Sequence, residues 1–343
     1  MKKNLEGVLG ETIEAILSSE IIVLTSHRNA DPDAVAPLFY LKSLLEKVFS
    51  RKTFIVLPEG LNEVSKKILY SIGLDNVFDH LLLYRTSIPS SYKTLYIVVD
   101  TSNSVQLGVV KDYVLSSKYI VLDHHREGDL GNRAYTGLID PSYTSTSELV
   151  YTLFKELYRP SMDEALLLIT GILYDTRRLL LASKKTIDTI KELTDICSSC
   201  YQEAIELLRV EPSYSEKIAR LKAMQRLEFI RIDKYIVAYT YVGAYESSIA
   251  RLLIELGADI AFVGSSRKDV VRIVGRARKN VLDELGVSLA RDVMPRIASC
   301  LLEGYGGGHD AAAVVTGRGD LLYALSCCIS VVRDIISSRA KRE

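Results

Sequence analysis

The feature that most constrains this fold is the alternation of short apolar runs with longer helix-like stretches over the first half of the chain. Four runs are apolar at nearly every position: Ile21–Thr25, Thr53–Leu57, Thr94–Val99 and Tyr119–Leu122. Such runs are typical of strands buried on both faces, and their alternation with helices is typical of a parallel sheet. We therefore expect an α/β fold whose N-terminal domain is a parallel sheet with helices on both faces.

A second and smaller α/β region is expected after a polar, helix-like stretch that is interrupted near Pro212. The strands expected there are Tyr235–Val242, Ile260–Val263 and Val270–Gly275, and the helices are Ser247–Leu256, Val287–Leu302 and Leu321–Ser337. The predicted organisation is a domain at residues 1–200, a helical connector at 201–229 and a second domain at 230–343.

Composition narrows the classes of function. The 43 basic and 43 acidic side chains cancel, so no overall field attracts long polyanions. No stretch approaches the ~20 apolar residues of a membrane span, and the N-terminal segment does not resemble a secretory signal. The five cysteines are odd in number, and the CxxC of Cys197 and Cys200 lacks the second pair that a zinc site needs. We expect a cytoplasmic protein with reduced thiols.

Acidic and histidine residues gather where the predicted elements end. The segment SHRNADPDA follows the first strand, VVD ends the third, LDHH ends the fourth, and YDT ends an apolar helix. The carboxyl ends of parallel strands meet at one edge of a sheet, where ligands bind. The chemistry-bearing residues of these segments are His27, Asp31, Asp33, Asp100, Asp123, His124, His125 and Asp175.

Each of these residues also has a structural interpretation. An Asp at a strand end is often the N-cap of the next helix, and a single His is most often a surface residue. The combination favours metal binding instead. Carboxylate and imidazole ligands without thiolate suit Mn²⁺, Mg²⁺ or Co²⁺, and the ligands are numerous enough for two ions. Two ions ~3.5–4 Å apart can clamp a phosphoryl group.

The four segments, in this order, resemble motifs I to IV of the DHH phosphoesterase family. The later segment GYGGGHDAAA resembles the glycine-rich signature of the associated DHHA1 domain. The resemblance implies two divalent cations, with Mn²⁺ the first choice. It assigns His27 and Asp31 to the first ion, Asp33, His124 and Asp175 to the second, and Asp100 to both. It further implies that Asp123 orients a metal-ligand imidazole and that His125 contacts the scissile phosphate.

The resemblance also implies that the second domain binds the substrate. The residues that match are Arg276 with its neighbour Arg278, and the run Gly306, Gly307, Gly308 and His309. Glycine allows backbone N–H groups to approach an anion closely. The structural alternative is a tight turn after a helix beside a solvated basic strand.

The sequence departs from the family pattern at three places. Arg177 stands where motif IV has a glycine, which leaves open whether the backbone changes or a phosphate contact is added. The run Ala311–Val315 replaces a glycine-containing segment, so helix packing there is left open. The run Ser265–Lys268 is similar to the Arg-Lys motif of family II pyrophosphatases, but we interpret it as solvated charge in a turn between strands.

The resemblance implies a hydrolase of phosphate esters in short oligonucleotides or nucleotides. The types it covers are the nanoRNases, the 3′-phosphoadenosine 5′-phosphate phosphatases and the dinucleotide phosphodiesterases. We expect a monomer or homodimer without membrane contact. One alternative is a RecJ-like single-strand exonuclease, although the chain has little room for further nucleic-acid-binding parts. Another is a non-catalytic DHH scaffold of a replication complex, which would have no use for converging carboxylates that repel one another without a cation.

Overall fold

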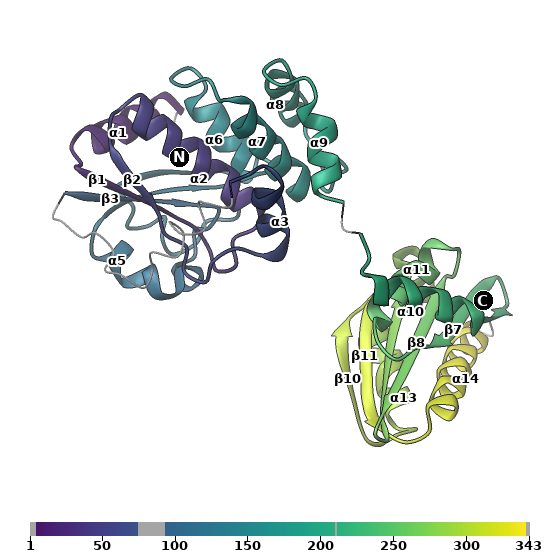
Figure 1. Ribbon diagram of the computed structural model, residues 1–343. Coiled ribbons are helices and arrows are strands. Elements are labelled where there is room, and N and C mark those ends of the chain that lie inside the picture. Colours follow the sequence, from purple (N-terminus) through teal and green to yellow (C-terminus); the bar gives the residue numbers. More distant parts are fainter. Residues whose placement is uncertain (1–4, 75–92, 210, 341–343) are drawn as a thin grey trace. The chain divides into compact units, whose positions relative to one another are not determined.

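The computed structural model describes residues 5–74, 93–209 and 211–340, which form two compact units, Met1–Val210 and Glu211–Glu343 (Figure 1). The stretch at 201–229, expected as a connector, is divided between them. Helix α9 (Cys200–Leu207) packs against α7 (Met162–Asp175) in the first unit, and α10 (Tyr214–Gln225) contacts a strand of the second.

The first unit is built on a five-stranded parallel sheet with the strand order β2-β1-β3-β4-β5. The strands are β1 (Ile21–Thr25), β2 (Lys52–Ile55), β3 (Thr94–Val99), β4 (Lys118–Asp123) and β5 (Thr136–Ile139). Strand β5 has no counterpart among the predicted strands, since its short sequence carries a glycine and little apolar surface. The other four lie where the apolar runs predict them.

Helices cover both faces of this sheet, as expected. Ile22 and Leu24 of β1 pack into one core with the larger helices, while Val23 between them packs into a second core with Leu107 and Val114. This division follows from the two-residue period of a strand. The remaining elements of the unit are α1 (Leu5–Leu17), α2 (Pro32–Lys47), α3 (Glu63–Ser71), η2 (Ser104–Val110), α5 (Lys111–Leu115), α6 (Thr146–Phe154) and α8 (Lys184–Thr194).

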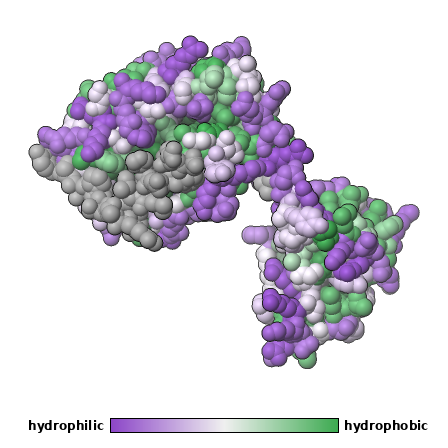
Figure 2. Space-filling view, in the orientation of Figure 1, coloured by the Kyte–Doolittle hydropathy of each residue, from purple (hydrophilic) through white to green (hydrophobic). Residues whose placement is uncertain are grey.

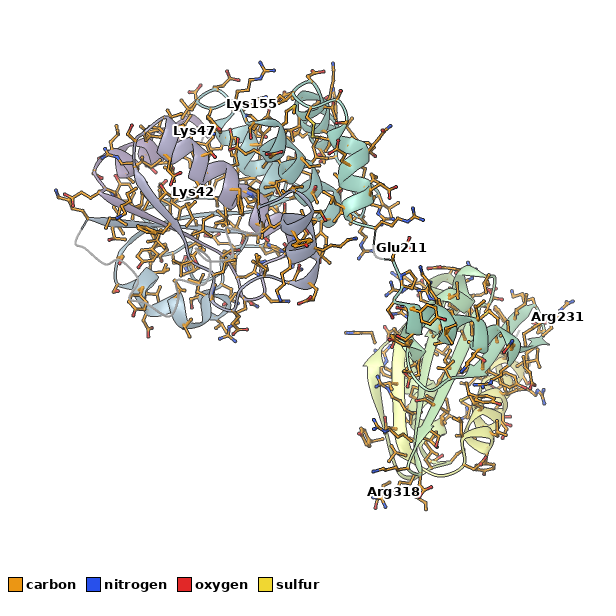
Figure 3. The ribbon with its side chains drawn as sticks, viewed as in Figure 1. Lys42, Lys47, Lys155, Glu211, Arg231 and Arg318 are labelled. Atoms are coloured by element: carbon orange, nitrogen blue, oxygen red, sulfur yellow. A yellow bond between two sulfur atoms is a disulfide. The ribbon has the colours of Figure 1, made fainter. Side chains whose placement is uncertain are left out.

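Cations on the outer helices of this unit are engaged with their neighbours. Lys47 of α2 donates to the Tyr158 hydroxyl at 2.8 Å, and Lys155 pairs with Glu192 at 2.8 Å (Figure 3). Hydrophilic side chains predominate on the described surface of this unit in the view of Figure 2. These lysines stabilise the helical layer and do not form a free basic groove.

The second unit is a six-stranded mixed sheet with the order β10-β11-β9-β8-β7-β6. Its strands are β6 (Glu228–Ile232), β7 (Tyr235–Tyr241), β8 (Ile260–Arg267), β9 (Val270–Ala277), β10 (Leu302–His309) and β11 (Ala312–Arg318). The helical elements are α10, α11 (Glu246–Glu255), α12 (Lys279–Leu285), η3 (Leu289–Val293), α13 (Met294–Ala298) and α14 (Leu321–Ala340). Every neighbouring pair is antiparallel except β7 and β8.

One expectation for this unit is wrong, and one structural alternative is excluded. The helix expected at Val287–Leu302 is broken into η3 and α13 and ends at Ala298, because the chain then turns into β10. The glycine-rich segment is therefore the strand β10, not a turn after a helix. Its partner β11 includes most of the alanine-rich run, whose packing was left open. The turn at Lys268 and Asp269 joins β8 to β9, as expected for solvated charge.

Helix α14 is, in the described part of the chain, long and apolar enough to cross a membrane by length and composition. The sequence alone predicted no stretch of this kind, so α14 differs from that expectation. The buried residues of α14 belong to the core of the second unit, where Leu325, Cys328 and Val332 pack against the sheet. The helix is thus accounted for by its packing.

The cysteines differ from expectation. Cys197 and Cys200 form a disulfide, whereas reduced thiols were expected for both. The turn between α8 and α9 brings their Cα atoms to 5.4 Å, within the usual range for a bridge. Cys300, Cys327 and Cys328 are free.

Candidate metal centre

The loop between β1 and α2 carries two of the expected ligands. Nε2 of His27 lies 3.3 Å from Asp100 Oδ2 and 3.9 Å from Asp31 Oδ1. The other ring nitrogen, Nδ1, contacts the Arg28 carbonyl at 2.7 Å, which fixes the ring and leaves Nε2 to face the carboxylates. Asp31 caps helix α2, accepting from two backbone N–H groups of the first turn at 3.0 and 3.1 Å. Its orientation is therefore fixed by the helix.

Asp33 is completely buried in the first turn of α2, where the N-terminus of α6 holds it. Its Oδ2 accepts from the N–H of Thr146 at 2.6 Å, and its Oδ1 accepts from the N–H of Ser147 at 3.0 Å. The positive end of a helix dipole favours a carboxylate at this place. Gly171 of α7 permits the close packing, since a Cβ there would lie 2.2 Å from Ser147 Oγ and 3.1 Å from Asp33 Oδ1.

Asp100 lies between two groups of ligands. Its Oδ2 faces His27, and its Oδ1 lies 3.7 Å from His124 Nε2 and accepts from the Thr146 hydroxyl at 2.7 Å. The two oxygens thus point to different neighbours, as those of a bridging carboxylate would. The backbone of Asp100 is left-handed, with φ 59°, an unusual conformation for a residue with a Cβ. Strain of this kind is concentrated at functional sites.

His124 lies at the centre of the second group. Its Nε2 lies 3.0 Å from Asp175 Oδ2 and 3.8 Å from Asp33 Oδ2. That nitrogen is buried, and within the described residues it has no well-aligned hydrogen bond. A buried imidazole nitrogen that faces three carboxylates in this way is suited to bind a cation.

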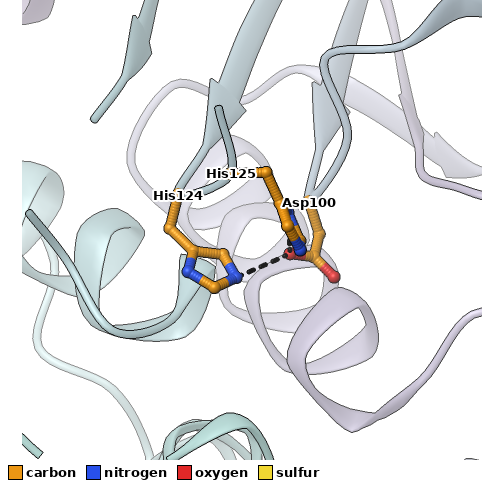
Figure 4. Close-up of side chains that lie close together, drawn as sticks. All are labelled: Asp100, His124 and His125. Carbon is orange, nitrogen blue, oxygen red and sulfur yellow. Dashed lines mark ion pairs between the residues drawn. The ribbon is translucent and has the colours of Figure 1, made fainter. Parts of the chain in front are cut away.

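The neighbouring His125 has a different environment. Figure 4 shows His124 and His125 converging on Asp100, whose Oδ1 lies 3.8 Å from His125 Nδ1. The same Nδ1 lies 2.8 Å from Asp123 Oδ1, and Asp123 also accepts from the His125 backbone N–H. The imidazole that Asp123 contacts is therefore His125, the residue expected to contact phosphate, whereas an imidazole among the expected metal ligands was predicted. The exposed side chain of His125 can reach a substrate.

Ligand atoms of these residues fall into three groups, each within 4.8 Å. The groups are His27, Asp31 and Asp100; Asp33, His124 and Asp175; and Asp100, His124 and His125. The first two match the two expected ion sites, with Asp100 between them. The structure brings all eight acidic and histidine residues of the four motifs to the carboxyl edge of the parallel sheet.

A cavity of about 480 Å³ opens over this cluster. Besides the expected residues, it is lined by polar residues that sequence analysis did not single out: Thr101, Ser102, Asn103, Gln106, Arg126 and Glu127. These residues follow β3 and β4, so their position after strands already known to carry ligands could have indicated them. The cavity is large enough for a small-molecule ligand.

The electrostatics of the two imidazoles favour protonation as long as no cation is present. Burial lowers the pKa of His27, but contact with Asp100 outweighs this and raises the pKa to about 9. Burial likewise lowers the pKa of His124, and the contact with Asp175 and the charges of Asp33 and Asp100 raise it to about 9.

The pKa values of two carboxylates of the cluster are also raised. Burial and the charge of Asp100 raise the pKa of Asp31 to about 6. Burial and the charges of Asp100 and Asp175 raise the pKa of Asp33 well above its usual range. The cluster therefore takes up protons to offset its crowded negative charge, and a divalent cation would replace them. Oxygen and imidazole donors with no thiolate fit Mn²⁺, Mg²⁺ or Co²⁺.

The turn after Asp175 explains the departure at Arg177. The N–H of Arg178 donates to the Leu173 carbonyl at 2.7 Å, and the N–H of Arg177 donates to Tyr174 at 3.3 Å. This is the hydrogen-bond pattern of a Schellman motif, in which the residue at the Arg177 position is left-handed and usually glycine. Arg177 keeps that conformation, with φ 51°, so the backbone is retained at a cost of roughly 1–2 kcal/mol.

The substrate-binding residues expected in the second unit differ in their surroundings. His309, Ala312 and Arg276 lie directly opposite one another on three neighbouring strands, and hence on one face of the sheet. Arg276 Nε is buried with no hydrogen bond within the described residues. The guanidinium of Arg278 instead donates to the Ala258 and Ile254 carbonyls at 3.1 and 2.8 Å, at the end of α11. This favours Arg276 over Arg278 as an anion-binding residue.

The glycines beside His309 have separate structural reasons. Gly308 has φ 138°, and a Cβ there would lie 2.6 Å from the Ala312 carbonyl oxygen. Around Gly307 nothing lies within 4 Å of such a Cβ, so its backbone is open on one side. Gly306 would place a Cβ 3.2 Å from Met294. The strand therefore exposes backbone at Gly307, where an anion could approach.

An Asp–His cluster that could hold divalent cations lies at the carboxyl edge of the parallel sheet, and similar proteins show the family to which such a chain belongs. Residues 21–172 match the DHH family, N-terminal domain. An uncharacterized protein of Methanocaldococcus jannaschii is 34% identical over 305 residues, covering 88% of each chain. The crystal structure of an exopolyphosphatase-related protein from Bacteroides fragilis covers 96% of each chain with a TM-score of 0.60 and 15% identity, which shows the shared fold.

A further relative comes from Streptococcus mutans and is named "Probable bifunctional oligoribonuclease and PAP phosphatase NrnA". It is 31% identical over 223 residues, which is 64% of this chain and 65% of that protein. The chain belongs to the DHH family. It is a hydrolase that acts on phosphoester or phosphoanhydride bonds.

Proposed function

We propose that the protein uses two divalent cations, Mn²⁺ by first choice, to hydrolyse phosphate esters of short oligonucleotides or nucleotides. The observation that carries the proposal is the position of Asp100 between two groups of ligands, with one oxygen toward each. Ions bound there would neutralise the phosphate charge and activate water. His27 and Asp31 would hold one ion, and Asp33, His124 and Asp175 the other.

The remaining residues have roles in orientation. Asp123 accepts from the His125 backbone, contacts its ring, and has a lowered pKa; burial opposes this shift, and the His125 contacts outweigh it. The same contact raises the pKa of His125, which favours the protonated ring that could donate to phosphate. Thr146 and Ser147 fix Asp100 and Asp33 in place.

The substrate class is supported by two observations. The Streptococcus mutans relative is named an oligoribonuclease and PAP phosphatase. In the second unit, Arg276 Nε is buried without a hydrogen bond among the described residues, and nothing packs against one side of the Gly307 backbone. Gly307 lies on the same strand as His309, and Arg276 lies on the same face of the sheet as His309. We assign Arg276, Gly307 and His309 to substrate binding on this basis.

The test is product analysis with Mn²⁺ on a panel of substrates. The panel contains RNA and DNA of ~2 to ~24 nucleotides, 3′-phosphoadenosine 5′-phosphate, linear and cyclic dinucleotides, and pyrophosphate. We expect the fastest turnover on the shortest oligonucleotides or on the nucleotide bisphosphate. Processive degradation of the longest strands would contradict the proposal and favour a RecJ-like exonuclease.

The bridging assignment has its own test. Asp100→Asn keeps the shape of the side chain and removes its charge, so turnover should fall by ~10³-fold or more, since two-ion chemistry needs the shared carboxylate. Asp188, an exposed carboxylate of α8 in the same unit, gives a control as Asp188→Asn, which should keep its Mn²⁺-dependent activity. Substantial activity of Asp100→Asn would rule out the two-ion arrangement.

A further inference from the structure

A second pocket, of about 300 Å³, lies at the C-terminal end of α7, the helix that carries Asp175. Its lining consists of Val64, Leu173, Tyr174, Arg177, Arg178 and Leu208. Tyr174 directly precedes Asp175, and its hydroxyl is hydrogen-bonded to the side chain of Asn62. The pocket therefore adjoins the metal cluster, because its lining residue Tyr174 is directly followed by Asp175. All of its lining residues belong to the first unit.

The two arginines of this pocket are engaged differently. The guanidinium of Arg178 donates to the Leu208 carbonyl at 3.2 Å, which ties the turn to the end of α9. Arg177 is exposed, and its side chain has no hydrogen bond or ion pair to any of the residues described by the structure. Its guanidinium is thus available to an anion, and guanidinium groups bind phosphate in a bidentate manner.

The rest of the pocket is suited to a flat ring. The partly exposed side chains of Val64 and Tyr174 supply apolar and aromatic surface, while Leu173 and Leu208 of the lining are buried. Nucleobases stack on aromatic side chains and pack on apolar ones with little dependence on sequence. The guanidinium can bind the phosphate of a nucleotide while the neighbouring surface binds its base. The volume of the pocket fits one nucleotide.

The fold itself does not ask for arginine at this position. Glycine would adopt the left-handed turn without strain, yet Arg177, Arg178 and Leu179 all have positive φ, at 51°, 58° and 69°. Strained residues of this kind are concentrated at active sites and ligand-binding sites. Of the two guanidinium groups at this turn, that of Arg177 has no hydrogen-bond partner among the described residues, so it is available to a ligand.

We propose that this pocket binds the nucleotide next to the scissile bond, with the base on Tyr174 and the apolar surface and a non-scissile phosphate on Arg177. The proposal deepens the function proposed above and rests on it for the class of substrate. It makes Arg177 a specificity-determining residue that favours substrates with a terminal phosphate. The metal centre itself does not depend on Arg177.

The experiment compares three substrates: the 5′-phosphorylated diadenylate pApA, unphosphorylated ApA, and bis(p-nitrophenyl) phosphate. Arg177→Gly should raise the KM for pApA by about ten- to a hundredfold, as expected for loss of a charged hydrogen bond. Its kcat, and its KM for the other two substrates, should stay within about twofold. The KM of Arg177→Lys for pApA should lie between those of the wild type and Arg177→Gly, since lysine keeps the positive charge but lacks the paired N–H donors of a guanidinium.

The matched control is Arg159→Ala, which removes an exposed arginine before the start of α7, the opposite end of that helix. It should leave all three KM values unchanged. Arg177→Gly should melt no lower than the wild type, because glycine suits the turn. Equal KM values of wild type and Arg177→Gly for pApA would overturn the proposal, and so would an equal loss on bis(p-nitrophenyl) phosphate.

A separate arm distinguishes failure of this proposal from failure of the proposed function. If the wild type cleaves neither dinucleotide, binding of AMP is measured by calorimetry instead. Weaker AMP binding by Arg177→Gly than by the wild type would keep the pocket and refute the dinucleotide substrate. Equal AMP binding by the two proteins would refute the pocket.

Discussion

Thr146 is the residue on which both halves of the centre depend, since its N–H reaches Asp33 and its hydroxyl reaches Asp100. Thr146→Val keeps the shape and the backbone donor but removes the hydroxyl. We expect Mn²⁺ affinity or kcat to fall by ~10- to 100-fold, the usual effect of losing a partner of a metal ligand. Thr146→Ser, which restores the hydroxyl, should recover most of the loss. Wild-type kinetics of Thr146→Val in a metal titration would contradict this role.

The raised pKa values lead to a prediction of pH dependence. His27 and His124 must be neutral to bind a cation, yet each has a pKa of about 9 without one. Binding therefore releases protons, and Mn²⁺ affinity should rise with pH between roughly 6 and 9. Calorimetry in two buffers with different ionisation enthalpies measures the protons released. Binding that releases no proton and does not vary with pH would show that the imidazoles are not ligands.

At the same scale, the residues differ in how far sequence predicts them. The acidic and histidine ligands are predictable because each follows a strand or ends a helix. Thr146 and Ser147 are not, because threonine and serine before a helix look like ordinary caps. Arg177 could be recognised as a departure from the family, but only the backbone shows that it retains the left-handed turn.

Among the elements, the packing of α7 against α2 and α6 is the most demanding contact near the centre. Gly171→Ala would place a Cβ 2.2 Å from Ser147 Oγ and 3.0 Å from the Pro32 carbonyl oxygen. We expect a loss of ~2–4 kcal/mol in the free energy of unfolding, as for overpacking together with displaced hydrogen bonds. Denaturant titration measures the loss, and metal affinity should fall with it.

The control for this variant is Gly10→Ala in α1, another helical glycine. Around Gly10 nothing lies within 4 Å of a Cβ, so alanine should stabilise that helix by ~1 kcal/mol. If Gly171→Ala were as stable as Gly10→Ala, the close contact between α7 and the ligand-bearing helices would be disproved.

The elements also show where prediction from sequence ends. The bounds of β1 and β3 follow from apolar runs alone, since a buried parallel strand has no polar face. Strand β10 could not be predicted, because four of its eight residues, in LEGYGGGH, are glycine and glycine is depleted in strands. It is a strand because β11 pairs with it along almost its whole length. That pairing depends on tertiary contacts that no local pattern contains.

For the whole molecule, the relevant feature is that each unit has its own cores. The buried clusters of residues 5–209 and of residues 211–340 share no member. We expect two thermal transitions in calorimetry of the full chain, with Mn²⁺ raising the midpoint of one only, because a ligand stabilises the part that binds it. The transition that shifts should be that of the first unit.

The same measurement addresses the scaffold alternative. At a free Mn²⁺ concentration of ~100 times Kd, the stabilisation should be ~2.7 kcal/mol. A shift of neither transition would mean that the centre binds no cation, and a shift of both would mean that the units unfold together. A shift of both transitions would still be compatible with the fold, but not with two units that unfold independently.

The candidate ligands of the centre come from four separate segments, the first at His27 and the last at Asp175. Most of the first unit must therefore be synthesised and packed before any ion could find its full set of donors, because none of the four segments supplies a site alone. Folding of sheets with such distant contacts is slow. A chain still emerging from the ribosome therefore lacks the assembled centre, which is complete only when α7, the last helix that contributes to it, has docked.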